Sequence, residues 1–280
     1  GVIFLCFCIF EPRKAKNKVY AEYTEDLNMN NPEKIRPFGM RDKLGYMIGN
    51  LGNDFTFTFA SVFLLVFYTK VLGISSAIVG TMFLIARFID AVTDITMGRI
   101  VDKMHPTKGG KFRPWLRRMC APVALSSFLM YQGAIAGASM SVKIVYMFVT
   151  YLLWSSIFYT SINIPYGSMA SVISSEADER AALSTYRSIG SVIVNILIGV
   201  GVPLFVYSTD SFGNQIVIGK NFTIIAGVFS ILTVICYLVC YSMTTERVKI
   251  TPPASHQKAN IGQTIKTLAK SRALIGIIIA

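Results

Sequence analysis

Hydrophobic residues run through this chain in six long stretches, separated by short segments rich in charged residues, Gly, Pro or Ser. A helix needs about 20 mainly apolar residues to cross a bilayer, and each stretch reaches that length. The predicted spans are 43–69, 75–101, 114–137, 143–173, 184–207 and 221–243. The pattern therefore predicts an all-α, polytopic membrane protein with a six-transmembrane-helix bundle over 43–243. A seventh apolar helix is predicted to start at 268 and to continue to 280.

Polar residues inside four of the spans recur at helical spacing, which places each set on one face of its helix. The sets are Asn50, Asp54, Thr58 and Ser61 in the first span, Gly80, Arg87, Asp90, Asp94 and Gly98 in the second, Ser156, Thr160, Asn163 and Gly167 in the fourth, and Ser184, Arg187, Ser191 and Asn195 in the fifth. Charged groups in a membrane usually face a protein interior or a wet cavity. We therefore expect these four helices to line one polar cavity, at the depth where secondary transporters hold substrate and coupling ion.

Two carboxylates, Asp90 and Asp94, lie one helical turn apart in the second span. They repel each other, and burial disfavours the charge of both, so a bound cation, a proton or the neighbouring Arg87 must compensate. In a cation site, a hydroxyl from Thr93 or Thr160 would add a further oxygen ligand. The residues alone also allow a permanent Arg87–Asp90 ion pair beside a protonated Asp94. They do not distinguish sodium from a proton as the coupling ion.

The other intramembrane polar residues also allow two interpretations each. Asp54 can accept hydrogen bonds from substrate hydroxyls or from a neighbouring helix. Arg187 can donate to a polar substrate or act as the counter-ion of Asp54. Tyr159 can stack on a sugar ring or simply pack among other side chains.

Composition and charge support the membrane assignment. Charged residues make up only 15% of the chain and the mean hydropathy is +0.53, whereas a soluble domain has roughly 25% charged residues. Of the 27 Lys and Arg residues behind the net charge of +12, 22 lie in segments 1–43, 99–118, 174–183 and 244–272. The positive-inside rule places these segments in the cytoplasm, including an N-terminal segment 1–42 and a middle loop 244–267. The excess charge therefore needs no nucleic-acid partner. We expect residues 1–28 to be a non-native extension.

The sequence offers little for catalysis or for a cofactor. Its five cysteines lie in apolar stretches without the paired spacing of a zinc site. We find no nucleophile–base pair, and we predict neither an enzyme nor a resident cofactor.

The loop around 109–115 lacks the Gly spacing and the Ser or Thr of a phosphate-binding loop. Its basic residues, Lys111 and Arg113, are predicted to form a cytoplasmic charge cluster that latches one conformation. Trp115 is predicted to lie in the interfacial aromatic belt.

Five ordered motifs resemble the glycoside–pentoside–hexuronide:cation symporter family, which includes the melibiose permease and belongs to the major facilitator superfamily. The motifs are KLGYMIGNLGNDF at 43–55, ARFIDAVTD at 86–94, GKFRPW at 110–115, YTSINIPY at 159–166 and ERAALSTYR at 179–187. The resemblance covers about 40–245. It implies a twelve-helix transporter of which this chain holds the N-terminal bundle, with the partner C-terminal half missing.

The resemblance also implies roles for particular residues. Asp90, Asp94 and Thr160 match cation-site positions, and Thr93 stands where the melibiose permease has an Asn. The implied sugar-binding positions are Asp54, Tyr159, Arg187 and Asn163, the last standing where the melibiose permease has an Asp. The implied function is symport of a sugar or glycoside with sodium or a proton across the cytoplasmic membrane, by alternating access. The alternatives are a porter for a non-sugar organic solute on the same scaffold, or a transport-inactive truncated fragment.

Overall fold

The computed structural model describes residues 36–103, 106–107, 109–209 and 215–248. The expectations for residues 1–28, for most of the middle loop and for the helix at 268–280 lie outside the described residues.

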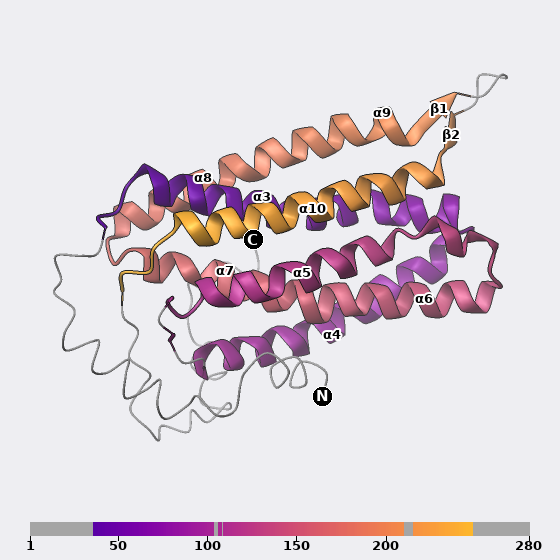
Figure 1. Ribbon diagram of the computed structural model, residues 1–280. Helices are drawn as coiled ribbons and strands as arrows, with labels where there is room; N and C mark the ends of the chain where they lie inside the picture. The colour runs from indigo at the N-terminus through magenta and orange to yellow at the C-terminus, as the bar shows by residue number, and fades with distance from the viewer. Residues whose placement is uncertain (1–35, 104–105, 108, 210–214, 249–280) are drawn as a thin grey trace, which may run out of the picture. The chain divides into compact units, whose positions relative to one another are not determined.

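The described chain is a bundle of helices that run back and forth along one direction (Figure 1). The first half comprises α3 (Met40–Val66) with the π-helical turn η2 (Phe67–Val71), α4 (Ser76–Lys103), and α5 (Arg113–Met130) with the 3-10 turn η3 (Gly133–Gly137). The second half comprises α6 (Met140–Leu152), the π-helical turn η4 (Leu153–Tyr159), α7 (Thr160–Ile173), α8 (Ala177–Ile196), the π-helical turn η5 (Leu197–Gly201), α9 (Val202–Val206), β1 (Tyr207–Thr209), β2 (Gln215–Val217) and α10 (Gly219–Met243).

The predicted all-α, polytopic fold is confirmed, because six helices in the described ranges are long and apolar enough to cross a membrane. Two local features differ from the sequence prediction. The fifth helix begins at Ala177 rather than at 184, since Asp178 and Glu179 occupy its first turn, where the helix dipole favours carboxylates. The turn after it contains a short antiparallel hairpin that pairs Tyr207 with Val217.

Helices α3 and α10 approach each other closely along a row of glycines on α3. A β-carbon added at Gly49 would lie 2.7 Å from the Cys240 sulfur and 2.8 Å from a Tyr166 ring carbon, and one added at Gly52 would lie 2.9 Å from the Cys236 β-carbon. Small residues at such spacing let two membrane helices pack backbone to backbone. This contact holds α3, which carries Asp54, in the middle of the bundle.

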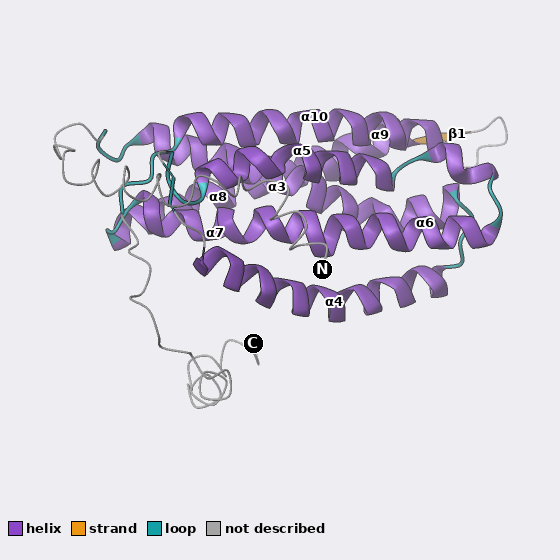
Figure 2. Cartoon of the chain, turned by 60° about the horizontal axis from the view of Figure 1, so that its bottom comes forward, coloured by secondary structure: helices purple, strands orange, loops and turns teal. Residues whose placement is uncertain are grey.

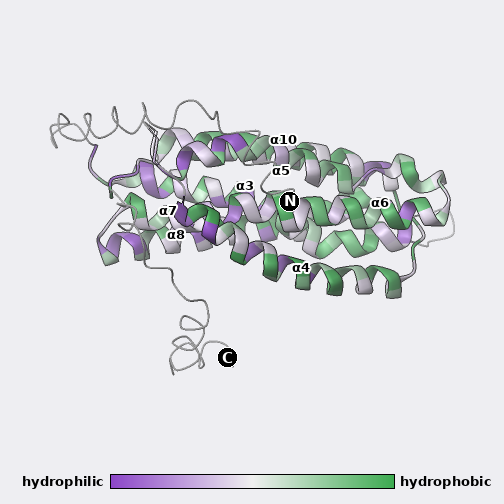
Figure 3. Cartoon of the chain, turned by 90° about the horizontal axis from the view of Figure 1, so that it is seen from below, coloured by the Kyte–Doolittle hydropathy of each residue, from purple (hydrophilic) through white to green (hydrophobic). Residues whose placement is uncertain are grey.

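Helix α4 runs along the edge of the bundle and bends gently beside α6 and α7 (Figure 2). Its outward face is apolar, with Phe88 71% exposed and Val92 66% exposed, which suits contact with lipid chains. Hydrophilic residues gather at the end of the bundle where α3 begins and α10 ends (Figure 3). The two polar residues of interest on α4, Asp90 and Asp94, instead lie on its inner side.

The interfacial position predicted for Trp115 is wrong. Its side chain is only 6% exposed, and its indole Nε1 donates to the Ser161 carbonyl at 2.5 Å. That carbonyl needs a donor from outside its helix, because Pro165, four residues later, has no N–H. Trp115 therefore fastens α5 to α7 inside the bundle.

A buried carboxylate joins the chain before α3 to the chain after α10. Asp42 is fully buried and forms ion pairs with Arg36 at 2.7 Å and Arg247 at 2.8 Å. It also accepts the backbone N–H of Thr245 at 3.1 Å and that of Gly39 at 3.3 Å. This set of contacts fixes the residues that follow α10 against the start of the bundle.

A second carboxylate at the same end caps α5. The Glu246 oxygens accept the backbone N–H groups of Lys111, Phe112 and Arg113 at 2.6–2.8 Å, which are groups left without partners at a helix start. Gly110 makes room for the carboxylate, since it has a φ of 107° and an added β-carbon would lie 2.5 Å from the Glu246 carboxyl carbon. Within the described ranges, backbone groups rather than basic side chains thus bind this acid.

We predict that Gly49→Ala destabilises the bundle, because the new methyl group overpacks the α3–α10 contact at a cost of about 1–3 kcal/mol. Gly80→Ala is the matched control, since Gly80 lies within α4 with nothing within 4 Å of an added β-carbon. Thermal unfolding in detergent should show a lower midpoint for Gly49→Ala and an unchanged or higher one for Gly80→Ala. Equal midpoints would contradict the close approach of α3 and α10.

We predict that Glu246→Ala also lowers the unfolding midpoint, because three backbone donors at the start of α5 lose a charged acceptor, at a cost of about 1.5–3 kcal/mol. Glu176→Ala is the control, because Glu176 is the N-cap residue of α8 but its side chain makes no capping hydrogen bond. The same thermal assay compares the two variants. A Glu176 effect as large as that of Glu246 would refute the capping role.

Candidate functional site

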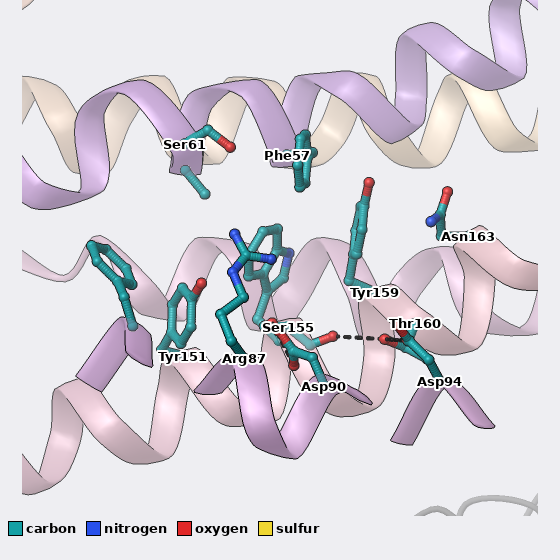
Figure 4. A pocket seen from close by; sticks show the side chains of 13 residues that line it. Phe57, Ser61, Arg87, Asp90, Asp94, Tyr151, Ser155, Tyr159, Thr160 and Asn163 are labelled. Carbon is teal, nitrogen blue, oxygen red and sulfur yellow. Dashed lines mark hydrogen bonds between the residues drawn. The ribbon is translucent and has the colours of Figure 1, made fainter. Parts of the chain in front are cut away.

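A cavity of about 450 Å³ opens between α3, α4 and the continuous helix formed by α6, η4 and α7. Its polar lining residues are Ser61, Arg87, Asp90, Asp94, Tyr151, Ser155, Tyr159, Thr160 and Asn163, and its apolar ones are Phe57, Ala60, Phe83 and Trp154. Figure 4 shows the Arg87 side chain reaching from α4 into the space below α3, with Asp90 and Asp94 beside Ser155 and Thr160. The structure thus brings together six of the residues predicted to form the site.

Both carboxylates of α4 are bound by hydroxyl groups of the facing helix. Asp90 accepts from Ser156 at 2.5 Å and from Ser155, whose oxygen lies 2.9 and 3.0 Å from the two carboxylate oxygens. Asp94 accepts from Thr160 at 3.0 Å. A carboxylate has about four acceptor positions, so both keep capacity for a cation or a proton on the cavity side.

The π-helical turn η4 makes this arrangement possible. In a regular α-helix, adjacent side chains point about 100° apart, yet here Ser155 and Ser156 both contact the same carboxylate. The wider turn is visible at Thr160, whose backbone N–H and hydroxyl both reach the Ser155 carbonyl five residues earlier. Single π-helical turns occur often at functional sites.

Two further predicted residues on α4 are Arg87, expected in a charge network, and Thr93, expected in the cation site, and the structure places them differently. Arg87 lines the cavity, but among the described residues no ion pair joins it to Asp90 or Asp94. The permanent Arg87–Asp90 pair therefore does not form. Thr93 donates its hydroxyl to the Asp90 backbone carbonyl at 3.0 Å and does not contribute to the cavity lining.

Asp54 belongs to a second polar cluster, between α3 and α8. It accepts from Ser191 at 2.6 Å and from Asn50 at 2.7 Å. The Arg187 Nε donates to the Asn50 side chain at 2.9 Å, so Arg187 reaches Asp54 through Asn50 and forms no direct ion pair with it within the described part of the chain. Asp54 thus joins two helices, while the one contact of its second carboxylate oxygen with the described residues is a long 3.4 Å one with Asn53.

Tyr159 connects the two clusters. Its hydroxyl accepts from Asn53 at 3.0 Å, beside Asp54, while its ring lines the cavity of Asp90 and Asp94. One face of the ring stacks on Phe57 with 5.3 Å between ring centroids, so this face is already covered. Asn163 lines the cavity one turn further along α7.

Sequence reasoning missed three members of this network. The sequence pattern does not point to Ser155, except that it is next to Ser156, because a regular helix would turn its side chain away from Asp90. Asn53 precedes Asp54 and lies off the polar face of its span. Tyr237 donates to the Asn53 side chain at 3.2 Å from α10, a helix without a polar stripe.

The predicted latch residues lie at the loop end, outside the cavity lining. Arg113 binds the Tyr241 carbonyl with Nε at 3.1 Å and Nη2 at 2.5 Å, so it caps the end of α10. Partial burial lowers the pKa of Lys111, while the nearby Asp102 and Glu246 oppose that shift. A latching role for these two basic residues stays a prediction.

Comparison with known proteins identifies the family. The profile of the family described as "MFS/sugar transport protein" matches residues 45–280. A glucuronide carrier protein homolog of Escherichia coli is 34% identical over 74% of this chain and 44% of its own length. A putative glycoside/cation symporter of the same organism is 37% identical over 59% of this chain and 35% of its own length.

A third relative is named for a different activity. A putative 2,3-dihydroxypropane-1-sulfonate exporter of Salmonella typhimurium is 32% identical over 90% of this chain and 53% of its own length. The chain spans about half the length of the curated relatives it matches. The six apolar helices, the carboxylate-lined cavity and the profile match lead to one conclusion: this chain is a multi-pass membrane protein of the MFS sugar transport family, within the major facilitator superfamily.

Proposed function

We propose that this chain forms the N-terminal half of a cation-coupled symporter that carries a sugar or glycoside by alternating access. The observation that carries the proposal is the pair of carboxylates, Asp90 and Asp94, each bound by hydroxyls and facing one cavity with Tyr159 and Asn163. Relatives named as a glycoside/cation symporter and as an isoprimeverose transporter support it. The protein would lie in the cytoplasmic membrane with its N-terminus in the cytoplasm.

The coupling ion, sodium or a proton, would bind between Asp90 and Asp94, with the Thr160 hydroxyl as a third oxygen. Binding would cancel one of the two negative charges, and the less negative site would favour substrate beside it. Ion and substrate would then raise each other's affinity by the same factor, as linkage requires. Joint occupancy would let this bundle and its C-terminal counterpart rock between outward-open and inward-open states.

Substrate hydroxyls would bind the groups at the junction of the two clusters. The Asp54 oxygen that has only the long contact with Asn53 retains acceptor capacity. Asn163 can both donate and accept, and the Arg187 guanidinium supplies donors beyond the one used on Asn50. Tyr159 would orient the substrate through the part of its ring that Phe57 and Trp154 leave uncovered.

A non-sugar organic solute is the second candidate, favoured by the relative named as a sulfonate exporter. A thermal-shift screen with and without sodium distinguishes the two, because sugars stabilise the protein only if they bind. The third candidate, a transport-inactive fragment, predicts no uptake by the 280-residue chain alone and full uptake by a longer protein.

We predict that Asp94→Asn weakens cation-driven accumulation of substrate by about tenfold or more. The change keeps the side-chain shape but removes a charge-assisted contact, and each 1.4 kcal/mol corresponds to a factor of ten. The measurement is accumulation of labelled sugar by proteoliposomes under an imposed sodium or proton gradient. The proteoliposomes contain the complete transporter that the gene encodes. Exchange of sugar at equal concentrations on both sides should persist.

Asp178→Asn is the matched control, because Asp178 is exposed in the first turn of α8. It should transport like the unmodified protein. Undiminished gradient-driven accumulation by both Asp94→Asn and Asp94→Ala would overturn the assignment of the cation site.

A further inference from the structure

A cluster of arginines lies where α5 begins and α10 ends, outside the cavity. The two helices lie side by side (Figure 1). The guanidinium carbons of Arg113 and Arg117 on α5 lie 4.9 and 5.1 Å from the centre of the Tyr241 ring on α10. Arg41 of α3 donates to the carbonyl of the next residue, Ser242, at 3.3 Å. Three guanidinium groups therefore lie against the last turn of one helix.

Arg117 is the member of this cluster whose hydrogen-bond donors remain available. The other two arginines use donors on consecutive carbonyls at the end of α10. Arg117 is exposed, and within the described ranges it contacts the Tyr241 ring but forms no hydrogen bond or ion pair. A guanidinium offers five N–H donors in a fixed plane, so Arg117 can bind an anion while it stays on the ring.

The electrostatics of the cluster favour such an anion. Arg113 and Arg117 are one helical turn apart, a spacing at which like charges repel. Arg113 also lies in the first turn of α5, where the helix dipole disfavours positive charge. The described acids nearest in the fold bind elsewhere, since Asp42 pairs with two other arginines and Glu246 accepts backbone N–H groups. A negative group beside Arg117 would offset the repulsion.

An exposed apolar surface continues from the cluster along both helices. On α5, Ala121 lies one turn beyond Arg117 and Leu125 one turn further, and both are exposed. On α10, Leu238 lies one turn before the Tyr241 ring, and the exposed face continues with Ile231, which is 63% exposed. The cavity is lined from other helices. The arginines therefore lie at the edge of a surface that suits lipid chains.

A charged cluster at the edge of an apolar surface matches a ligand that has an anionic head and acyl chains. We propose that Arg117 on the Tyr241 ring, flanked by Arg41 and Arg113, binds the headgroup phosphate of an anionic phospholipid. Arginine forms parallel hydrogen bonds with phosphate oxygens, and the acyl chains would lie on the exposed faces of α5 and α10. A zwitterionic lipid fits less well, because its own ammonium group would lie beside the arginines.

The test measures lipid binding to the complete transporter in a neutral detergent by native mass spectrometry. The probes are phosphatidylglycerol and phosphatidylcholine with identical palmitoyl and oleoyl chains, so they differ only in the headgroup. We expect the first phosphatidylglycerol to bind about fivefold or more tightly than the first phosphatidylcholine, as one arginine near a membrane surface provides. Inorganic phosphate at the same concentration should not displace it, because phosphate buries no apolar surface.

The variants separate one site from a general effect of charge. Arg117→Gln should weaken phosphatidylglycerol binding about fivefold and leave phosphatidylcholine binding unchanged, while Arg117→Lys should retain most of the affinity. Arg99→Gln is the matched control. Arg99 is exposed near the end of α4 and, among the described residues, stacks on no aromatic ring. This control removes the same charge and should bind both lipids like the unmodified protein.

Three results would overturn the lipid site. Equal binding of the two lipids by the unmodified protein would do so without any variant. Equal weakening of phosphatidylglycerol binding by Arg117→Gln and Arg99→Gln would show that the lipid responds only to overall charge. Displacement of the lipid by inorganic phosphate would identify a site for a soluble anion instead. None of these measurements depends on transport, so they are independent of the proposed function.

Discussion

The arrangement of this bundle depends on one constraint, which is that a carboxylate at membrane depth needs donors or a cation around it. Asp90 and Asp94 obtain hydroxyl donors from Ser155, Ser156 and Thr160 on the facing helix. The π-helical turn η4 is the local distortion that lets two adjacent serines reach one carboxylate. These hydroxyl donors supply no positive charge, and the carboxylates have about four acceptor positions each, so oxygen positions remain that the donors do not occupy.

A second polar cluster, on the central helix α3, is joined to the first through Tyr159. Asn53 on α3 connects Tyr159 of the cavity with Tyr237 of α10, beside Asp54. This bridge exists because the glycine row of α3 brings α10 close enough for its tyrosine to reach across. Packing and polar chemistry are therefore coupled, since a shift of α10 would also disturb the groups around Asp54.

Charged side chains at the loop end of the bundle bind different partners from the carboxylates in the cavity. Arg36 and Arg247 form ion pairs with Asp42 at this end, but the Glu246 carboxylate accepts backbone N–H groups at the start of α5. Arg113 binds a backbone carbonyl at the end of α10. Both contacts satisfy groups that every helix leaves unpaired at its ends, so the charges here hold helix termini together.

The sequence alone determined the membrane class, the six helices and the residues that carry the intramembrane charge. These follow from local quantities: the length of each apolar stretch, and a helical period that places Asp90 and Asp94 on one face. Only the tertiary structure decided which polar side chains bind one another. Arg187 contacts Asn50 rather than Asp54, the Thr93 hydroxyl donates to the Asp90 backbone carbonyl, and Ser155 and Tyr237 join the network. Such contacts depend on a π-helical turn and on helix spacing, which arise from packing between distant segments and leave no periodic trace along the chain.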